Sequence, residues 1–125
     1  MNHDKQLDFA PTLLKQIVHN SLNEVYVFDG EMLKFLFVNR GALLNLGYDF
    51  DELQLLTPID IKPEFSTSQF MELIQPLKDG TTEKLTFQTK HRRKDTSTYD
   101  VEVHLQYFTE DDRSYFFAII LDITE

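Results

Sequence analysis

Two carboxylates, Asp100 and Glu102, have the spacing at which one strand presents side chains on the same face. Paired carboxylates perform general acid–base chemistry when burial separates their pKa values. The surrounding alternation places Val101 and Val103 on the buried face, so we predict that both carboxylates lie at a solvated edge. The chain also has no phosphate-binding glycine loop and no Gly-x-Ser-x-Gly nucleophile elbow.

The positions of the histidines and the absence of cysteine argue against several kinds of metal-binding site. The four histidines are scattered, and none has a carboxylate at the spacing of a metal-ligand set. We expect His91, beside a basic turn, to be a half-exposed structural residue, and His104 to lie on the outer face of its sheet. Because the chain has no cysteine, it forms no disulfide, thiolate zinc site or covalent haem linkage.

Size and charge narrow the class of protein and its partners. A chain of 125 residues has the length of one domain. With 21 acidic and 12 basic residues, its net charge of -9 opposes binding to nucleic-acid phosphates. The longest apolar runs, such as residues 115–121, are far shorter than the ~20 residues of a membrane helix. We expect a cytoplasmic protein with no membrane segment in this chain.

The first 22 residues predict an amphipathic helix that flanks the rest of the chain. Apolar side chains recur there at intervals of three and four, which places them on one stripe of a helix: Phe9, Leu13, Leu14, Ile17, Val18 and Leu22. Such a stripe packs on its own domain or on a second copy of the chain. The sequence leaves both alternatives open.

A hairpin and a capped helix follow. Residues 25–28 and 33–38 predict two short strands, joined by a tight turn at Asp29-Gly30. Asn39 is placed to cap the next helix with its side-chain oxygen, and Gly47 to end it in a left-handed conformation.

Further helical segments precede the last strands. Asp49 and Glu52 have the spacing of a capping box, and residues 57–58 predict one more helical turn. Ser66 begins a longer helix, whose last turn Pro76 should bend or shorten.

From residue 81 onwards the apolar period changes from helical to two. Residues 85–89, 101–108 and 114–124 predict three half-buried antiparallel strands connected by polar turns. The predicted fold class is therefore α+β: one five-stranded antiparallel sheet with short helices packed on one face, preceded by the flanking helix.

Several segments in this order resemble the PAS domain, a sensor module of signalling proteins such as histidine kinases and GGDEF diguanylate cyclases. The matching segments are Asn39, Gly47-Tyr48, Glu52-Leu53, Arg93-Lys94-Asp95 and Asp122-Ile123-Thr124. Thr96 departs from the family's pattern, which has a glycine at that position. The resemblance implies a PAS core at residues 23–125, with residues 1–22 as its flanking helix.

The resemblance implies a sheet folded around a pocket that the helices close. Alternation and position matching assign a set of side chains to the pocket: Phe37, Leu43, Phe70, Leu73, Ile74, Leu77, Leu85, Phe87, Thr89, His91, Val101, Val103, Leu105, Phe116, Ala118 and Ile120. The same side chains would also fill a core simply by packing on one another. A ligand pocket and a self-filled core both remain open.

Position matching argues against two cofactors of the family. Pro58 stands where the flavin-binding LOV domains have their reactive cysteine, and their three flavin-binding amides fall at His91, Val101 and Ile120, two of which are apolar. Haem-binding members use a histidine on the helix that matches residues 66–80, where this chain has none. The cofactor is unknown, and the choice left is a small apolar metabolite or no ligand.

The function implied by the resemblance is regulation of an effector domain that follows this chain. A ligand or partner would change the packing of a homodimer, with the signal leaving through Asp122, Ile123 and Thr124. Side chains of the flanking helix and the outer sheet face are the interface candidates: Phe9, Leu13, Leu14, Ile17, Val18, Phe117, Ile119 and Leu121. The alternatives are a protein-interaction module with a self-filled core and an enzyme with Asp100 or Glu102 in a cleft.

Overall fold

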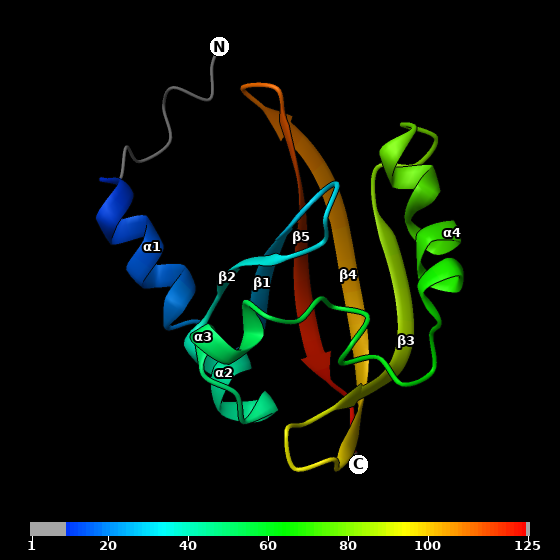
Figure 1. The fold of residues 1–125 in the computed structure, drawn as a ribbon. Coiled ribbons are helices and arrows are strands. Elements are labelled where there is room, and N and C mark those ends of the chain that lie inside the picture. The colour runs from blue at the N-terminus through cyan, green and yellow to red at the C-terminus, as the bar shows by residue number, and fades with distance from the viewer. Residues whose placement is uncertain (1–9, 125) are drawn as a thin grey trace.

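The computed structural model describes residues 10–124, and its centre is an antiparallel sheet of five strands (Figure 1). The spatial order is β2-β1-β5-β4-β3. The strands are β1 (Glu24–Asp29), β2 (Phe35–Val38), β3 (Leu85–Arg92), β4 (Thr98–Glu110) and β5 (Arg113–Asp122), and the helices are α1 (Pro11–His19), α2 (Arg40–Leu46), α3 (Phe50–Leu53) and α4 (Thr67–Lys78). The predicted α+β class is confirmed.

Alternation along the strands gives the sheet two different faces. On β5, Phe116, Ala118 and Ile120 are buried, whereas the intervening Phe117 and Ile119 are only half-buried. We call the buried face, which packs against α4 and the other short helices, the inner face, and the opposite one the outer face. The α+β layering therefore follows directly from a period of two along the strands.

The sharpest turn of the sheet joins its two longest strands, β4 and β5. Glu110 pairs with Arg113, which leaves only Asp111 and Asp112 in the turn. Their φ angles are 51° and 64°. Two consecutive left-handed residues match the right-handed twist of the flanking strands, and aspartate is among the residues that tolerate this conformation. This is one of the polar turns that the sequence predicts.

The predicted helix caps are present. The Asn39 side chain accepts a hydrogen bond from the Ala42 amide, and Gly47 ends α2 with a φ of 81°. Asp49 and Glu52 form the capping box of α3. Ser66 caps α4 through a second capping box. Local signals of this kind involve a few neighbouring residues, which is why the sequence alone reveals them.

Other local predictions are wrong. The flanking helix ends at His19 and does not continue to residue 22. Leu33 lies in the turn with a φ of 60°, so β2 begins at Phe35 and the loop is longer than a tight hairpin. The Asp29 carboxylate accepts hydrogen bonds from the backbone amides of this loop and stabilises it. From Thr57 the chain forms hydrogen-bonded turns instead of a regular helix, with the Asp60 amide donating to the Thr57 carbonyl at 3.0 Å. Pro76 does not shorten α4, which continues to Lys78.

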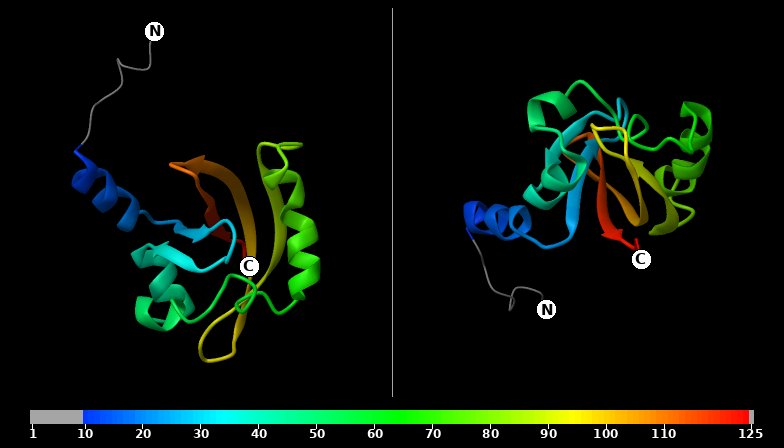
Figure 2. Two further views of the ribbon diagram at one scale, coloured as in Figure 1. Left: turned by 45° about the horizontal axis from the view of Figure 1, so that its top comes forward. Right: turned by 90° about the horizontal axis from the view of Figure 1, so that it is seen from below.

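Helix α1 stands apart from the sheet, next to β2 (Figure 2). None of its residues is buried. Its main attachment is a buried side chain, Asn39, whose Nδ2 donates to the backbone oxygens of Val18 at 3.1 Å and Asn23 at 2.9 Å. Within residues 10–124, no helix combines the length and apolar character needed to cross a membrane.

Candidate functional site

Nearly all the predicted pocket residues lie on the inner face. The buried ones are Phe70, Ile74, Leu77, Thr89, His91, Val101, Val103, Leu105, Phe116, Ala118 and Ile120. Leu43, Leu73, Leu85 and Phe87 are partly buried and pack against the same cluster. Phe37 does not belong to this set: it pairs with Val27 on the outer side of the sheet, and its ring meets His19 of α1 at 6.3 Å. The assignment of Phe37 is therefore corrected.

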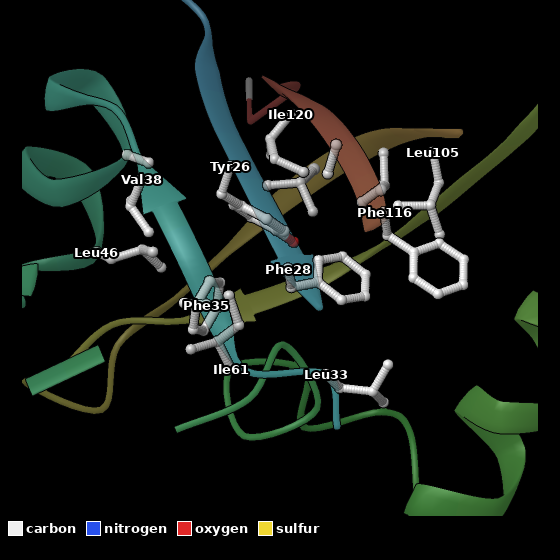
Figure 3. Packing of buried hydrophobic residues seen from close by; sticks show 14 of the residues in the cluster. Tyr26, Phe28, Leu33, Phe35, Val38, Leu46, Ile61, Leu105, Phe116 and Ile120 are labelled. Carbon is white, nitrogen blue, oxygen red and sulfur yellow. The ribbon is translucent and has the colours of Figure 1, made fainter. Parts of the chain in front are cut away.

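Aromatic rings fill the centre of the inner face (Figure 3). Phe28 stacks on Phe116 with ring centroids 4.9 Å apart, and Phe70 approaches Phe28 at 6.4 Å. Phe65 extends the cluster from Phe70 to Phe87. These contacts give the inner face the close packing of a protein core.

A lysine is buried among these rings. The side chain of Lys62 is 1% exposed, and its Nζ donates to the Tyr26 hydroxyl at 2.9 Å. Nζ also lies 5.5 Å from the ring centroids of Tyr26 and Phe70, which is within the range of a cation–π contact. Burial lowers the pKa of Lys62 to about 7, and the charge of Glu24 opposes this shift. The inner face therefore contains an amine that titrates near neutral pH.

Lys62 comes from the segment between α3 and α4, residues 54–66, which we call the strap. The strap is fastened to β3, where the Arg92 amide donates to the Ile61 carbonyl at 2.8 Å. Two residues beyond Lys62, the Glu64 carboxylate accepts from the Thr89 hydroxyl at 2.8 Å. Because the strap is held on both sides of Lys62, that side chain is directed inward, against the rings of the inner face.

His91 lies next to Arg92 on β3 and is completely buried. The prediction of a half-exposed histidine is therefore wrong, because the strap covers this end of β3. Neither ring nitrogen has a hydrogen-bond partner among the described residues. Burial, and secondarily the charge of Lys62, lowers the pKa of His91, so the imidazole is neutral at physiological pH.

A buried carboxylate, Glu24, completes the polar groups at this end of the sheet. It accepts hydrogen bonds from the Tyr99 hydroxyl at 2.9 Å and from Asn45 Nδ2 at 2.8 Å. Burial raises the pKa of Glu24, while these two hydrogen bonds oppose the shift. Arg93 stacks on the Tyr99 ring at 4.3 Å and donates to the Asn45 backbone oxygen at 3.0 Å. The turn after β3 is thereby linked to α2.

Thr96, in the same turn, has a φ of 76°. This is the position where the PAS pattern has glycine, which adopts such angles without steric cost. Thr96 adopts this left-handed conformation although its side chain is β-branched. Lys94 in the turn forms an ion pair with Glu52 of α3.

The predicted signal exit is hydrogen-bonded to the sheet. The Ile123 amide donates to the Asp100 carbonyl at 2.9 Å, and the Asp100 amide donates to Thr124 Oγ1 at 3.2 Å. Asp122 accepts from the Thr124 amide at 3.0 Å. Asp100 follows Tyr99, the residue that contacts both Glu24 and His91. Hydrogen bonds through Asp100 and Tyr99 thus connect the exit with the buried polar groups.

The remaining charged side chains of the sheet face outward, as predicted. Asp100 pairs with Lys90 at 2.6 Å, and Glu102 pairs with His104 at 2.8 Å. Asp100 also lines an open depression beside Ile123 and Thr124. Within residues 10–124, no three histidine, aspartate or glutamate side chains gather as a set that could hold a metal ion.

The predicted interface residues form two exposed groups. On α1, Leu13, Leu14 and Ile17 are each about half exposed and Val18 is half-buried. On the outer face, Phe117, Ile119 and Leu121 are half-buried. Phe9 lies outside the described residues. An open groove of about 570 Å³ runs between α1 and β2 and is lined by Phe37 and Leu43, among others.

Comparison with known proteins identifies the family. A sequence profile described as a PAS domain matches residues 23–125 of the chain. The chain belongs to the PAS domain family. The match begins immediately after the predicted flanking segment.

Solved PAS structures share this fold. A PAS domain from a two-component sensor histidine kinase is 18% identical, with a TM-score of 0.76 over 89% of this chain and 94% of that one. The PAS domain of an HTR-like protein from Haloarcula marismortui is 28% identical, with a TM-score of 0.76 over 90% of each chain. An RNA-binding light-oxygen-voltage receptor is 16% identical, with a TM-score of 0.79 over 99% of this chain and 36% of that one. No curated protein matches this PAS domain.

Several buried polar side chains of this PAS domain were not predicted from the sequence. Lys62 and Glu24 stand in no recognisable motif, and a lysine between an isoleucine and a proline predicts an exposed loop. Tyr26 and Tyr99 were simply two of the chain's five tyrosines. A signal did exist for Tyr99, which continues the apolar alternation of Val101 and Val103 by one step.

Proposed function

We propose that this PAS domain is the regulatory sensor and dimerisation module of a signal-transduction protein. It passes a packing change, induced by a ligand or a partner, to an effector domain that follows residue 125. Its location in the cytoplasm, expected from the sequence, belongs to this proposal. The sensor kinase origin of a PAS relative supports the role, since the same fold there belongs to a signalling protein.

The observation that carries the proposal is the connection between the inner face and the exit. Tyr99 contacts the buried Glu24, and the next residue, Asp100, holds Ile123 and Thr124 through two hydrogen bonds. A change in packing around Tyr99 must therefore move the backbone that leads out of the domain. A ligand favours such a change only through different affinities for the two packing states.

The homodimer is the second element of the proposal. The exposed apolar residues Leu13, Leu14 and Ile17 lie on one helix that buries no residue against its own domain. Helix faces of this kind become stable when a second apolar surface covers them. The half-buried residues of the outer sheet face offer a further apolar surface for the same contact.

Charge substitutions at the proposed interface test the dimer. Leu14→Asp and Ile119→Glu place a carboxylate in the apolar contact, so both variants should be monomeric in native mass spectrometry, whereas the wild type should be dimeric. Leu44→Asp is the matched control, because Leu44 is 72% exposed on α2 and lies outside the proposed interface. A monomeric wild type, or dimers that persist in both interface variants, would contradict the proposal.

A protein-interaction module with a self-filled core is the alternative function. The stacking of Phe28 on Phe116 favours it, because these rings occupy the centre of the inner face. In that case a partner protein would change the packing from outside. The same native mass spectra distinguish the two functions: protein purified without added ligand should carry an extra mass only if the inner face binds a small molecule.

A further inference from the structure

Lys62 is a buried cation without a buried anion beside it. Its hydrogen bonds go to neutral oxygens, the Tyr26 hydroxyl at 2.9 Å and the Pro58 carbonyl at 3.5 Å. No carboxylate of residues 10–124 lies within ion-pair distance of Nζ. Glu24, whose charge acts on Lys62 from farther away, already accepts hydrogen bonds from Tyr99 and Asn45. An ammonium buried in this way is strongly destabilising unless an anion joins it.

Two more hydrogen-bond donors lie buried at this end of the inner face: Tyr26, which contacts Lys62, and His91, whose pKa the charge of Lys62 helps to lower. The Tyr26 hydroxyl accepts the Lys62 hydrogen bond, so its own proton is still available, and none of the described residues accepts it. Neutral His91 carries one N–H, and neither of its ring nitrogens has a partner in this part of the chain. Buried polar groups without partners are rare in folded proteins, and each one calls for an explanation. Here, the hydrogen-bonding groups without partners at the end of the inner face are mainly donors.

We propose that the inner face binds a small monocarboxylate, whose carboxylate lies on Lys62 with Tyr26 and His91 as further donors and whose apolar body replaces part of the aromatic packing around Phe70. This inference rests on the proposed sensor function and names its ligand class. It also modifies the small apolar metabolite that the sequence left open as one choice, because the sequence did not predict the amine of Lys62 among the apolar side chains.

The ligand class follows from charge and shape. A carboxylate supplies several acceptor positions, which suits a cluster of two or three donors. A single negative charge neutralises the one ammonium, whereas a second charge would be left unpaired among Phe28, Phe70 and Phe116. In this proposal the strap provides the way in, because it covers Lys62 and is fastened to β3 by a few hydrogen bonds, including the one between Glu64 and Thr89, and by the buried Ile61. Binding requires the strap to lift.

Calorimetric titration with three sodium salts tests the proposal. Benzoate and butyrate carry a carboxylate on an apolar body, and chloride is the inorganic control at equal ionic strength. We expect benzoate or butyrate to bind at pH 7 and chloride not to bind at equal concentration. Binding of chloride as strong as that of the acids, or no binding of either acid at any pH from 6 to 9, would overturn the assignment.

The pH dependence of binding is specific to the lysine. The titratable groups around it are Glu24 and Tyr26 on β1, His91 on β3 and Tyr99 on β4, while α4 contributes the uncharged Phe70. Only the ammonium form of Lys62 attracts a carboxylate, and its pKa is about 7. Affinity should therefore fall roughly fifty-fold between pH 7 and pH 9. Affinity that stays constant over this range would contradict the role of Lys62.

Two variants isolate the contact. Lys62→Met keeps the length of the side chain and removes its charge, so carboxylate binding should be lost, whereas Lys84→Met at an exposed position should leave it unchanged. Tyr26→Phe keeps the ring and should weaken binding about tenfold, the loss of one hydrogen bond. Equal affinity in Lys62→Met and wild type would overturn the proposal. Native mass spectrometry of the same samples separates a failure of this inference from a failure of the proposed function. If the protein is dimeric but does not bind carboxylates, only the proposed ligand is wrong and the proposed signalling module remains.

Discussion

The inner face of the sheet buries ionisable side chains, whereas helix α1 exposes apolar ones. The inner face buries a lysine, a glutamate and a histidine among its aromatic rings, whereas α1 exposes three large aliphatic side chains. Each arrangement is unfavourable for the isolated domain. A buried charged group loses its hydration, and an exposed apolar side chain remains in contact with water. We infer two kinds of missing contact: Lys62 has no anion within ion-pair distance, and the exposed aliphatic side chains of α1 are not covered by their own domain.

Substitution of one phenylalanine on each face of the sheet tests the difference between the two faces. The inner-face substitution should give the largest loss of stability of the changes considered. Phe116 is fully buried on the inner face and stacks on Phe28, whereas Phe108 is 45% exposed on the outer face of the neighbouring strand. Phe116→Ala should lower the free energy of unfolding by about 3–5 kcal/mol, because it leaves a cavity in the core. Phe108→Ala should cost less than about 1 kcal/mol.

Urea unfolding of both variants gives these values. Equal losses would mean that the outer face is covered as completely as the inner face within a single domain. In that case the half-buried residues of β5 would offer no surface to a second copy.

Asn39 joins the two regions, and its removal should give the next largest effect. Its buried amide contacts the Val18 and Asn23 carbonyls and the amides of Val25 and Ala42. Asn39→Ala leaves several buried backbone groups without partners, so we expect a loss of roughly 2–3 kcal/mol in the free energy of unfolding.

Asn23→Ala is the control, because the Asn23 side chain is exposed and its contact with Asn39 is through the backbone. Amide hydrogen exchange should also speed up along α1 in Asn39→Ala. Unchanged exchange there would show that α1 is held by other contacts.

The two regions also differ in how far the sequence predicted them. The alternation of β4 and β5 and the caps at Asn39, Gly47 and Ser66 were readable because each depends on residues close in the chain. The positions of Lys62 and His91 were not, because they depend on how the strap meets β3, a contact between segments distant in sequence. Phe37 was misplaced for a related reason: the irregular pairing between Val27 and Phe28 changes which β2 residues face inward.

Urea unfolding of wild type and Lys62→Met at pH 7 and pH 9 tests whether the inner face contains a lysine that loses its charge near neutral pH. The pKa of Lys62 is lowered from 10.5 to about 7 in the folded protein, so the unfolded chain binds more protons across this range. The free energy of unfolding of the wild type should therefore increase from pH 7 to pH 9. This increase should exceed that of Lys62→Met by about 2 kcal/mol. An equal change in both proteins would show that Lys62 titrates as an exposed lysine, and would contradict the account.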